Sequence, residues 1–364
     1  MKKLCIAALA ASAVGCILPA MADEAPKDGA ARPDPAAFQL QDKFDHIGAE
    51  VHSFSNGGRD SFFLNEGDKD DRAVVFIGGQ GTSLEAFQLT EFARTMREEL
   101  GLRVISVERN GFGESQFDPS LGYGDYTKEV LAVLDHLGVE RFAIMAISGG
   151  GAYAAHLAAA VPDRVISLHA GAAVSRTLPT RTEPDCSRSA EDWNKRLAAF
   201  TQKPKDWWGV PGSPVLAIPG WQTRAYADGT RSFYVNGQLG DPAALTHESM
   251  LPCGEDAVAD TSKIAAPVYL YYGEADQAVT LQEMQQWQAA FSNIAKAAVY
   301  PDEGHTVQYR HWDQILADMA GCADHTLVCR EADTKLVPNE EVAEGEYLGI
   351  CAWTVSEATG SIPN

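Results

Sequence analysis

The sequence predicts an α/β fold: an eight-stranded, mostly parallel sheet with helices on both faces and a cap inserted after the sixth strand. Two observations lead to this prediction. Short apolar, β-branched runs alternate with helical segments, which is the pattern of a parallel sheet covered on both sides. The alternation stops between about Ser175 and Ser262, where prolines and four of the seven tryptophans lie. An insertion there would emerge at the carboxyl edge of the sheet, where open α/β sheets bind ligands.

Eight short runs have the composition of strands, and five longer segments have the periodicity of helices. The first two strands flank Asn56-Gly57-Gly58, a hairpin signal, and the other six are expected to be buried on both faces. The expected strands are Ala49–Phe54, Asp60–Leu64, Ala73–Ile77, Arg103–Val107, Phe142–Ile147, Val165–Leu168, Val268–Tyr272 and Ala297–Tyr300. The expected helices are Leu84–Leu100, Tyr126–Leu137, Gly149–Ala160, Leu281–Ile294 and Tyr309–Met319.

The two ends of the chain differ from its middle. Residues 1–22 have the basic start, apolar stretch and small-residue site of a secretory signal, so we expect cleavage after Ala22 and a periplasmic or secreted protein without a membrane span. Lipidation at Cys16 is the second interpretation. The expected units are a disordered leader (23–43), a core (44–174 and 263–320), a cap or lid (175–262) and a disulfide-containing C-terminal tail (321–364) with a strand at Tyr347–Val355.

The composition excludes several classes of protein. With 45% apolar and 22% charged residues, the chain is typical of globular proteins and not of disordered or fibrous ones. Its 29 Lys and Arg against 50 Asp and Glu give a net charge of -21, which argues against nucleic acid as a partner. We therefore expect a small-molecule substrate.

Five cysteines follow the predicted signal: Cys186, Cys253, Cys322, Cys329 and Cys351. In an oxidising compartment, five cysteines indicate two disulfides and one free thiol. The favoured pairing joins Cys186 to Cys253 and places one bridge among the last three. No paired Cys or Cys/His spacing of a metal site occurs, so no metal is expected.

Ser148 lies in a segment that fits the strand-to-helix turn of a catalytic nucleophile. Residues 146–151 (AISGGG) directly follow an apolar strand and precede an alanine-rich helix. In such a turn the residues two before and two after the serine must be small, and Ala146 and Gly150 meet this need. A phosphate loop is the alternative, but a Walker lysine and a dinucleotide fingerprint are both missing.

A serine nucleophile needs a base, and the base needs an acid that orients it. Asp276 follows the strand that ends at Tyr272, and His305 follows the last strand, so both should lie at the same sheet edge as Ser148. The chain order serine, aspartate, histidine is that of one known catalytic arrangement. Glu274 is the alternative acid. The alternative bases are His169, at the end of a predicted strand, and His311, within a predicted helix.

Backbone N–H groups must also stabilise the oxyanion of acyl transfer. One donor is expected from Gly149, the residue after the nucleophile. The other is assigned to Gln80, with Gly79 next, because the loop of residues 77–83 (IGGQGTS) follows the third strand. Three tryptophans of the cap, Trp207, Trp208 and Trp221, are the expected substrate contacts.

Over roughly residues 45–320, the chain resembles the α/β-hydrolase superfamily, and more loosely its capped esterases, lactonases, C–C hydrolases and proline iminopeptidases. Ser148, Asp276 and His305 match the triad positions of that family. Residues 109–115 (RNGFGES) look like the family's turn after the fourth strand, which we interpret as architectural. The chain departs from the family pattern at Gly78, where many members have histidine, and at Ala146, which replaces the first glycine of G-x-S-x-G.

The resemblance implies a two-step reaction through an acyl-enzyme on Ser148, without metal or organic cofactor. The expected substrate is a carboxylic ester or lactone with an apolar or aromatic part, because ester leaving groups make the lightest demands. An aminopeptidase or amidase is the alternative and would need acidic cap residues such as Glu183, Glu191 or Asp192. A C–C bond hydrolase and a noncatalytic binding protein that retains the fold are further alternatives.

Overall fold

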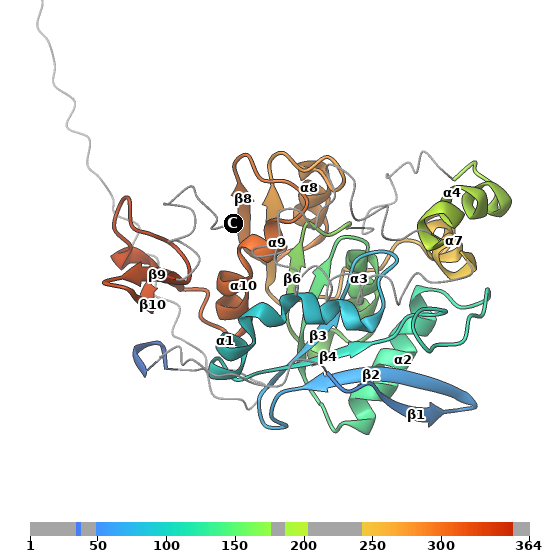
Figure 1. The fold of residues 1–364 in the computed structure, drawn as a ribbon, viewed down its shortest axis with the longest axis horizontal. Coiled ribbons are helices and arrows are strands. Elements are labelled where there is room, and N and C mark those ends of the chain that lie inside the picture. Colours follow the sequence, from blue (N-terminus) through green and yellow to red (C-terminus); the bar gives the residue numbers. More distant parts are fainter. Residues whose placement is uncertain (1–33, 38–48, 176–185, 203–241, 352–364) are drawn as a thin grey trace, which may run out of the picture.

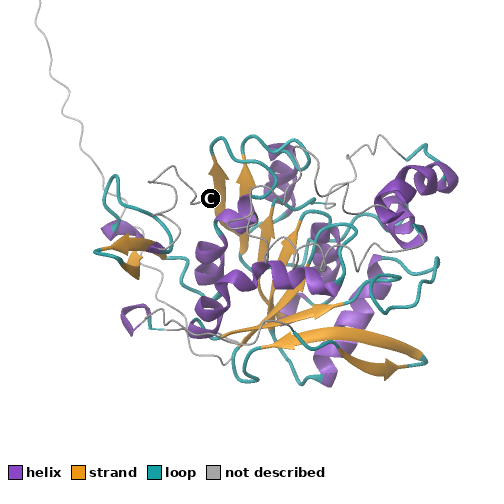
Figure 2. Cartoon of the chain, in the orientation of Figure 1, coloured by secondary structure: helices purple, strands orange, loops and turns teal. Residues whose placement is uncertain are grey.

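The computed structural model describes residues 34–37, 49–175, 186–202 and 242–351. A single large sheet lies at the centre of the molecule with helices in front of it and behind it (Figure 1, Figure 2). Its eight strands have the order β1-β2-β4-β3-β5-β6-β7-β8. Strands β1 and β2 pair antiparallel with each other, β2 pairs antiparallel with β4, and the other neighbours are parallel. The predicted eight-stranded, mostly parallel fold is confirmed.

The strands begin and end close to the predicted bounds. They are β1 (His52–Asn56), β2 (Arg59–Glu66), β3 (Arg72–Ile77), β4 (Leu102–Val107), β5 (Phe142–Ile147), β6 (Val165–Gly171), β7 (Val268–Gly273) and β8 (Ile294–Tyr300). Strands β3, β4 and β5 are buried at every residue, as their apolar composition predicts for the centre of a parallel sheet.

Two hydrophobic cores lie on the two faces of the sheet, because successive side chains of a strand point to opposite sides. In β3, Val75 and Ile77 join one core, while Val74 and Phe76 join the other. The first core is covered by α2 (Tyr123–His136), α3 (Gly150–Ala160) and α8 (Leu281–Ala290). The second is covered by η2 (Leu84–Ala93), α1 (Arg94–Glu99), α9 (Val307–Arg310) and α10 (Trp312–Met319). The short η3 (Pro162–Arg164) leads into β6.

Several expectations about individual elements are wrong. The helix predicted over Leu84–Leu100 starts as a 3-10 helix and becomes α-helical at Arg94, and the helix predicted over Tyr309–Met319 breaks at His311. Strand β8 is not buried on both faces. It is the edge strand, so Ala298 and Tyr300 pack on the second core while Val299 stays 40% exposed.

The insertion between β6 and β7 contributes α4 (Ala190–Gln202), α7 (Ala243–Met250) and η5 (Leu251–Cys253). Helices α4 and α7 lie side by side at one end of the molecule (Figure 1). Leu197 of α4 and Leu245 of α7 form a small core with Phe112 from the loop after β4. A disulfide joins Cys186, just before α4, to Cys253 at the end of η5. The described helices of the insertion therefore pack against the loop after β4, and the disulfide joins the segments that flank them.

The C-terminal tail is a hairpin at the opposite end of the molecule from α4 and α7 (Figure 1). It consists of β9 (His325–Arg330), β10 (Asp333–Pro338) and η6 (Asn339–Glu341), and Leu327 and Leu336 extend the second core. The strand predicted at Tyr347–Val355 is wrong within the described residues, where only Leu348 makes an isolated bridge, to Val328. In the predicted leader, Pro35–Ala37 forms a 3-10 helix, η1, beside β10.

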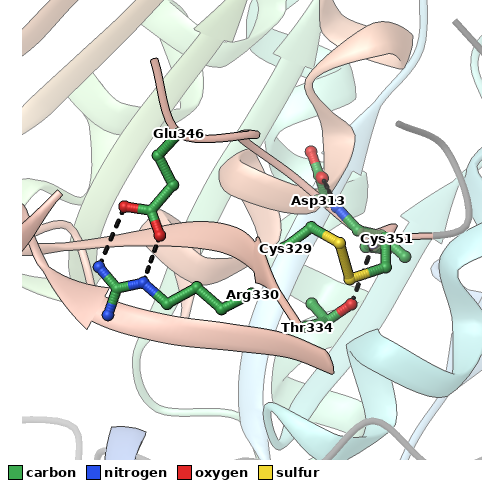
Figure 3. The surroundings of a disulfide bond; sticks show 7 residues. Asp313, Cys329, Arg330, Thr334, Glu346 and Cys351 are labelled. Carbon is green, nitrogen blue, oxygen red and sulfur yellow. Dashed lines mark hydrogen bonds and ion pairs between the residues drawn. A yellow bond between two sulfur atoms is a disulfide. The ribbon is translucent and has the colours of Figure 1, made fainter. Parts of the chain in front are cut away.

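The second disulfide joins Cys329 of β9 to Cys351 and fastens the segment that follows η6 to the hairpin (Figure 3). The backbone N–H of Cys351 donates to the Thr334 hydroxyl, and the Arg330 guanidinium pairs with Glu346 in the same region. Cys322 is buried and belongs to neither of these two disulfides. Among the described residues, no helix is both long and apolar enough to cross a bilayer. The predicted signal and its cleavage site lie outside the described residues.

Candidate active site

Ser148 occupies a strained turn between β5 and α3. Its φ is 50°, in the left-handed region that L-residues rarely adopt. The Ser148 carbonyl accepts hydrogen bonds from the N–H groups of Gly151 (3.1 Å) and Val174 (2.9 Å), which hold the turn in place. The turn therefore presents the serine side chain beyond the carboxyl end of β5, as the nucleophile turn requires.

Gly150 is packed too tightly against β3 for any side chain. A Cβ atom at this position would clash with the Ile77 carbonyl oxygen and lie 2.6 Å from that of Gly78. We expect Gly150→Ala to lower the free energy of unfolding by about 3 kcal/mol, because backbone atoms cannot move aside as side chains do. Gly124→Ala in α2, which has nothing within 4 Å, is the matched control and should stabilise by about 0.5–1 kcal/mol. Urea unfolding of both variants measures the difference, and equal effects would contradict this packing.

Ser148, His305 and Asp276 form one hydrogen-bonded chain. The His305 Nε2 atom lies 3.0 Å from Ser148 Oγ, and Nδ1 lies 2.8 Å from Asp276 Oδ2. An ionised carboxylate only accepts hydrogen bonds, so Nδ1 carries the proton and donates it, which leaves Nε2 free to accept from the serine hydroxyl. Asp276 is 5% exposed, and its other oxygen accepts from the N–H groups of Ala278 and Val279. The Asp276 carboxylate is thus held by two backbone N–H groups as well as by the His305 ring.

The loops that carry the acid and the base are held against each other. The N–H of Glu274 donates to the Tyr300 carbonyl (2.9 Å), and that of Ala275 donates to the Glu303 carbonyl (2.8 Å). Gly273, the last residue of β7, permits this approach, because a Cβ atom there would meet the backbone of Glu303. The parallel pairing of β7 with β8 brings the two loops to the same edge as Ser148.

The alternative acid and bases do not reach Ser148. Glu274 is exposed, whereas Asp276 contacts His305. His169 lies inside β6, where its ring bonds to the hydroxyls of Ser167 and Tyr271, and burial lowers its pKa to about 3. His311 bonds to Glu303 through Nε2 at 2.9 Å. Of the three predicted histidines, the structure therefore brings only His305 to the serine.

The loop after β3 lies beside the nucleophile. A Cβ atom on Gly149 would be 3.0 Å from the Gln80 backbone nitrogen, so the two expected oxyanion donors are neighbours. Within the described part of the chain, no hydrogen-bond acceptor is assigned to the N–H of Gln80 or of Gly149. Gly79 borders the serine side chain. An oxyanion requires two such N–H groups, and these two have no acceptor among the described residues.

Arg109, in the turn that the sequence suggested to be architectural, contacts this loop directly. Its guanidinium donates to the carbonyls of Gly79 (2.6 Å) and Thr82 (2.6 Å) and pairs with Glu248 of α7 at 2.8 Å. Burial raises the pKa of the neighbouring Glu108 to about 8, and the carboxylate that forms the ion pair with Arg109 is that of Glu248. Sequence reasoning did not identify Glu248.

A cavity of about 280 Å³ opens in front of Ser148. Trp193 of α4 and Tyr123 of α2 bring aromatic rings to its lining, whereas the predicted contacts Trp207, Trp208 and Trp221 lie outside the described residues. The cavity is lined by Gln80, Tyr123, Ser148, Gly149, Ala152, Tyr153, Val174, Trp193, Glu248, Ser249, Pro252, Cys253, Ala278 and Val279. The tryptophan content of the insertion could have indicated Trp193, but no sequence signal indicates Tyr123.

The described acids of the insertion provide no free negative charge in the cavity. Glu191 is exposed on α4 and pairs with Lys195, and Asp192 accepts from Ser189 at the start of α4. Glu183 lies outside the described residues. Glu248 lines the cavity, but its charge is neutralised by Arg109. In the part of the chain that the structure describes, no cluster of three His, Cys, Asp or Glu side chains could hold a metal ion.

Comparisons with known proteins agree with this architecture. The chain is 23% identical over 267 residues to a bifunctional esterase/perhydrolase of Acinetobacter calcoaceticus, covering 72% of this chain and 95% of that protein. A thermophilic esterase from Thermogutta terrifontis superimposes with a TM-score of 0.54 at 17% identity, covering 75% of this chain and 97% of the other. Est816, described as an enzyme that degrades N-acyl homoserine lactones, superimposes with a TM-score of 0.52 at 22% identity, covering 74% and 99%.

The two structural likenesses extend over most of the chain but establish the fold alone. The family assignment comes from the sequence, because the model of the alpha/beta hydrolase family matches residues 74–318, which is more than half of the chain. That span begins in β3 and ends in α10, and it includes Ser148, Asp276 and His305. The chain belongs to the alpha/beta hydrolase family, and it is a hydrolase.

Proposed function

We propose that this protein is a secreted or periplasmic serine hydrolase that cleaves a carboxylic ester or lactone through an acyl-enzyme on Ser148. One observation carries the proposal. The hydrogen-bonded chain from Asp276 through His305 to Ser148 ends in a cavity at which the N–H groups of Gln80 and Gly149 are also found. Nucleophile, base, orienting acid and oxyanion donors are thus within reach of one carbonyl group.

The first half of the reaction would form the acyl-enzyme. Ser148 Oγ attacks the carbonyl carbon while its proton passes to His305 Nε2, and the negative charge of Asp276 stabilises the imidazolium. The carbonyl oxygen becomes an oxyanion that accepts hydrogen bonds from Gln80 and Gly149. The intermediate collapses as the C–O bond breaks and His305 returns the proton to the leaving alkoxide.

The second half would repeat these steps with water. His305 Nε2 takes a proton from water, the hydroxide attacks the acyl carbon, and the oxyanion forms again in the same place. Collapse breaks the bond to Ser148 Oγ, which regains its proton from His305. The products are a carboxylic acid and an alcohol, or one hydroxy acid if the substrate is a lactone.

The cavity favours an uncharged substrate with an apolar or aromatic part. Trp193, Tyr123 and Val279 supply the apolar part of a lining that is otherwise mostly polar, and about 280 Å³ is close to the lower limit of typical small-ligand pockets. The only described acid in the lining, Glu248, is paired with Arg109, so an ammonium group of a peptide would find no free carboxylate there. The relatives named as an esterase and as a lactone-degrading enzyme support the same substrate class.

The proposed compartment depends on the cysteines and on the apolar N-terminal segment. Two disulfides, Cys186–Cys253 and Cys329–Cys351, are compatible with an oxidising environment, because disulfides persist outside the cytosol. Residues 1–22 supply the expected signal, with cleavage after Ala22.

Covalent labelling with a fluorophosphonate tests the proposed function. The wild-type protein should be labelled at Ser148 and should hydrolyse nitrophenyl esters, whereas Ser148→Ala should do neither. Nitrophenyl esters of increasing acyl chain length then measure the size of the pocket. We expect short acyl groups to be preferred because the cavity is small. A folded wild-type protein that shows neither labelling nor turnover of esters or lactones would contradict the proposal.

A further inference from the structure

The two peptide groups on either side of Gln80 are each held by a buried charged side chain. This matters because Gln80 supplies one of the two oxyanion donors, so the inference that follows rests on the proposed function. An oxyanion donor acts through its direction, and the direction of a backbone N–H is fixed by the plane of its peptide group.

Arg109 fixes the peptide group that contains the Gln80 N–H. In a trans peptide the N–H points opposite to the C=O of the preceding residue, and no described peptide bond is cis. The preceding carbonyl is that of Gly79, and it accepts a hydrogen bond of 2.6 Å from Arg109 Nη2. The same carbonyl also accepts from the Thr82 hydroxyl at 2.7 Å, and that hydroxyl lies 3.2 Å from the guanidinium. Arg109 and Thr82 therefore hold the carbonyl on their side, so the Gln80 N–H points in the opposite direction.

Glu248 fixes the next peptide group. The Gly81 N–H donates to Glu248 Oε2 at 2.7 Å, and Gly81 has a φ of 75°. The same helix, α7, reaches the loop a second time, because the Gln80 side-chain amide donates to the Ser249 hydroxyl at 2.7 Å. Gln80 is thus held on its amino side by Arg109 and on its carboxyl side by Glu248.

Arg109 and Glu248 also form an ion pair with each other. Arg109 Nη1 lies 2.8 Å from Glu248 Oε1, and the side chains are only 4% and 6% exposed. The Tyr153 hydroxyl, from the helix that follows the nucleophile, donates to the same carboxylate at 3.3 Å. Glu248 comes from the insertion, Arg109 from the turn after β4, and Tyr153 from α3. The Glu248 carboxylate therefore links α7 of the insertion to the loop of residues 77–83 and to α3, the helix that follows Ser148.

We propose that Glu248 is a positioning residue that sets the direction of the Gln80 N–H, so that the oxyanion site is complete only when α7 of the insertion is docked. The insertion then contributes to the catalytic geometry as well as to the lining of the cavity. Glu248 touches no reacting atom; it acts through Arg109 and through the Gly81 N–H.

The test compares Glu248→Ala, Glu248→Gln and Ser249→Ala with the matched control Glu191→Gln, which neutralises an exposed acid of α4 in the same insertion. Active sites are first counted by fluorophosphonate labelling, and kcat is expressed per labelled site. Losing the position of one oxyanion donor should lower kcat by about 10- to 100-fold in Glu248→Ala, while KM changes little. Glu248→Gln keeps an oxygen for Gly81 but loses the charge for Arg109, so its kcat should be intermediate.

A trifluoromethyl ketone supplies a second readout. Its adduct with Ser148 carries an oxyanion, so its inhibition constant should rise by the factor by which kcat/KM falls. A purely structural role would reduce the labelled fraction and leave kcat per site and the inhibition constant unchanged, and this result would overturn the inference. If Glu248→Ala does not fold, an unchanged kcat in both Glu248→Gln and Ser249→Ala overturns it equally. Absence of wild-type labelling and turnover would instead refute the proposed function.

Discussion

Replacing Ser148 or His305 by alanine is expected to lower kcat for ester hydrolysis by about 10⁶-fold, and Asp276→Asn by about 10⁴-fold. The relative sizes of these losses follow from the role of each residue. Without Ser148 no acyl-enzyme forms, and without His305 nothing takes the serine proton. In Asp276→Asn the amide can donate a hydrogen bond to Nδ1, which would place the imidazole proton on Nε2 and leave the ring unable to accept from Ser148.

The double variant tests whether the residues act as a unit. Ser148→Ala combined with His305→Ala should be no less active than either single variant, because each alone already abolishes the covalent route. Glu274→Gln is the matched control for the acid: it lies two residues from Asp276, is exposed, and should keep kcat within about twofold. Multiplied losses in the double variant, or a large loss in Glu274→Gln, would contradict the assigned roles.

Much of the fold could be predicted because its strands are continuous apolar runs. Strands β3, β4 and β5 are buried on both faces, so their sequences are mostly apolar, with only Arg72, Arg103 and Ser106 as polar residues. The hairpin β9–β10 was missed for the opposite reason. Its turn has Glu331 and Ala332 at φ values of 54° and 65°, where glycine or asparagine would give a recognisable signal.

The residues of the candidate site were also predictable only in part. Ser148, Asp276 and His305 each follow a strand directly, so local sequence and chain order were enough to suggest them. The contact between Arg109 and Glu248 joins residues 139 positions apart through an insertion of irregular pattern, and no local periodicity reports such a pair. Tyr123 was missed because α2 begins three residues before the predicted start at Tyr126.

Removing the Cys186–Cys253 disulfide is expected to lower the free energy of unfolding by about 4 kcal/mol, and removing Cys329–Cys351 by about 3 kcal/mol. The difference follows from loop length, because the first bridge joins residues 67 apart and the second joins residues 22 apart. A longer closed loop removes more conformational entropy from the unfolded chain. Serine should replace both cysteines of a pair together, so that no new free thiol is created, and urea unfolding measures the change.

The effects of removing the two disulfides should differ more in enzymatic activity than in stability. Cys253 lines the cavity and follows α7, the helix that bears Glu248, whereas Cys329 and Cys351 lie in the tail at the opposite end of the molecule. Loss of Cys186–Cys253 should therefore lower kcat per labelled site by about tenfold, since it loosens the helix that positions an oxyanion donor. Loss of Cys329–Cys351 should leave kcat per site unchanged at temperatures where the variant stays folded. Equal falls in kcat for both pairs would mean that the bridges act only through overall stability, and the link between α7 and catalysis would then fail.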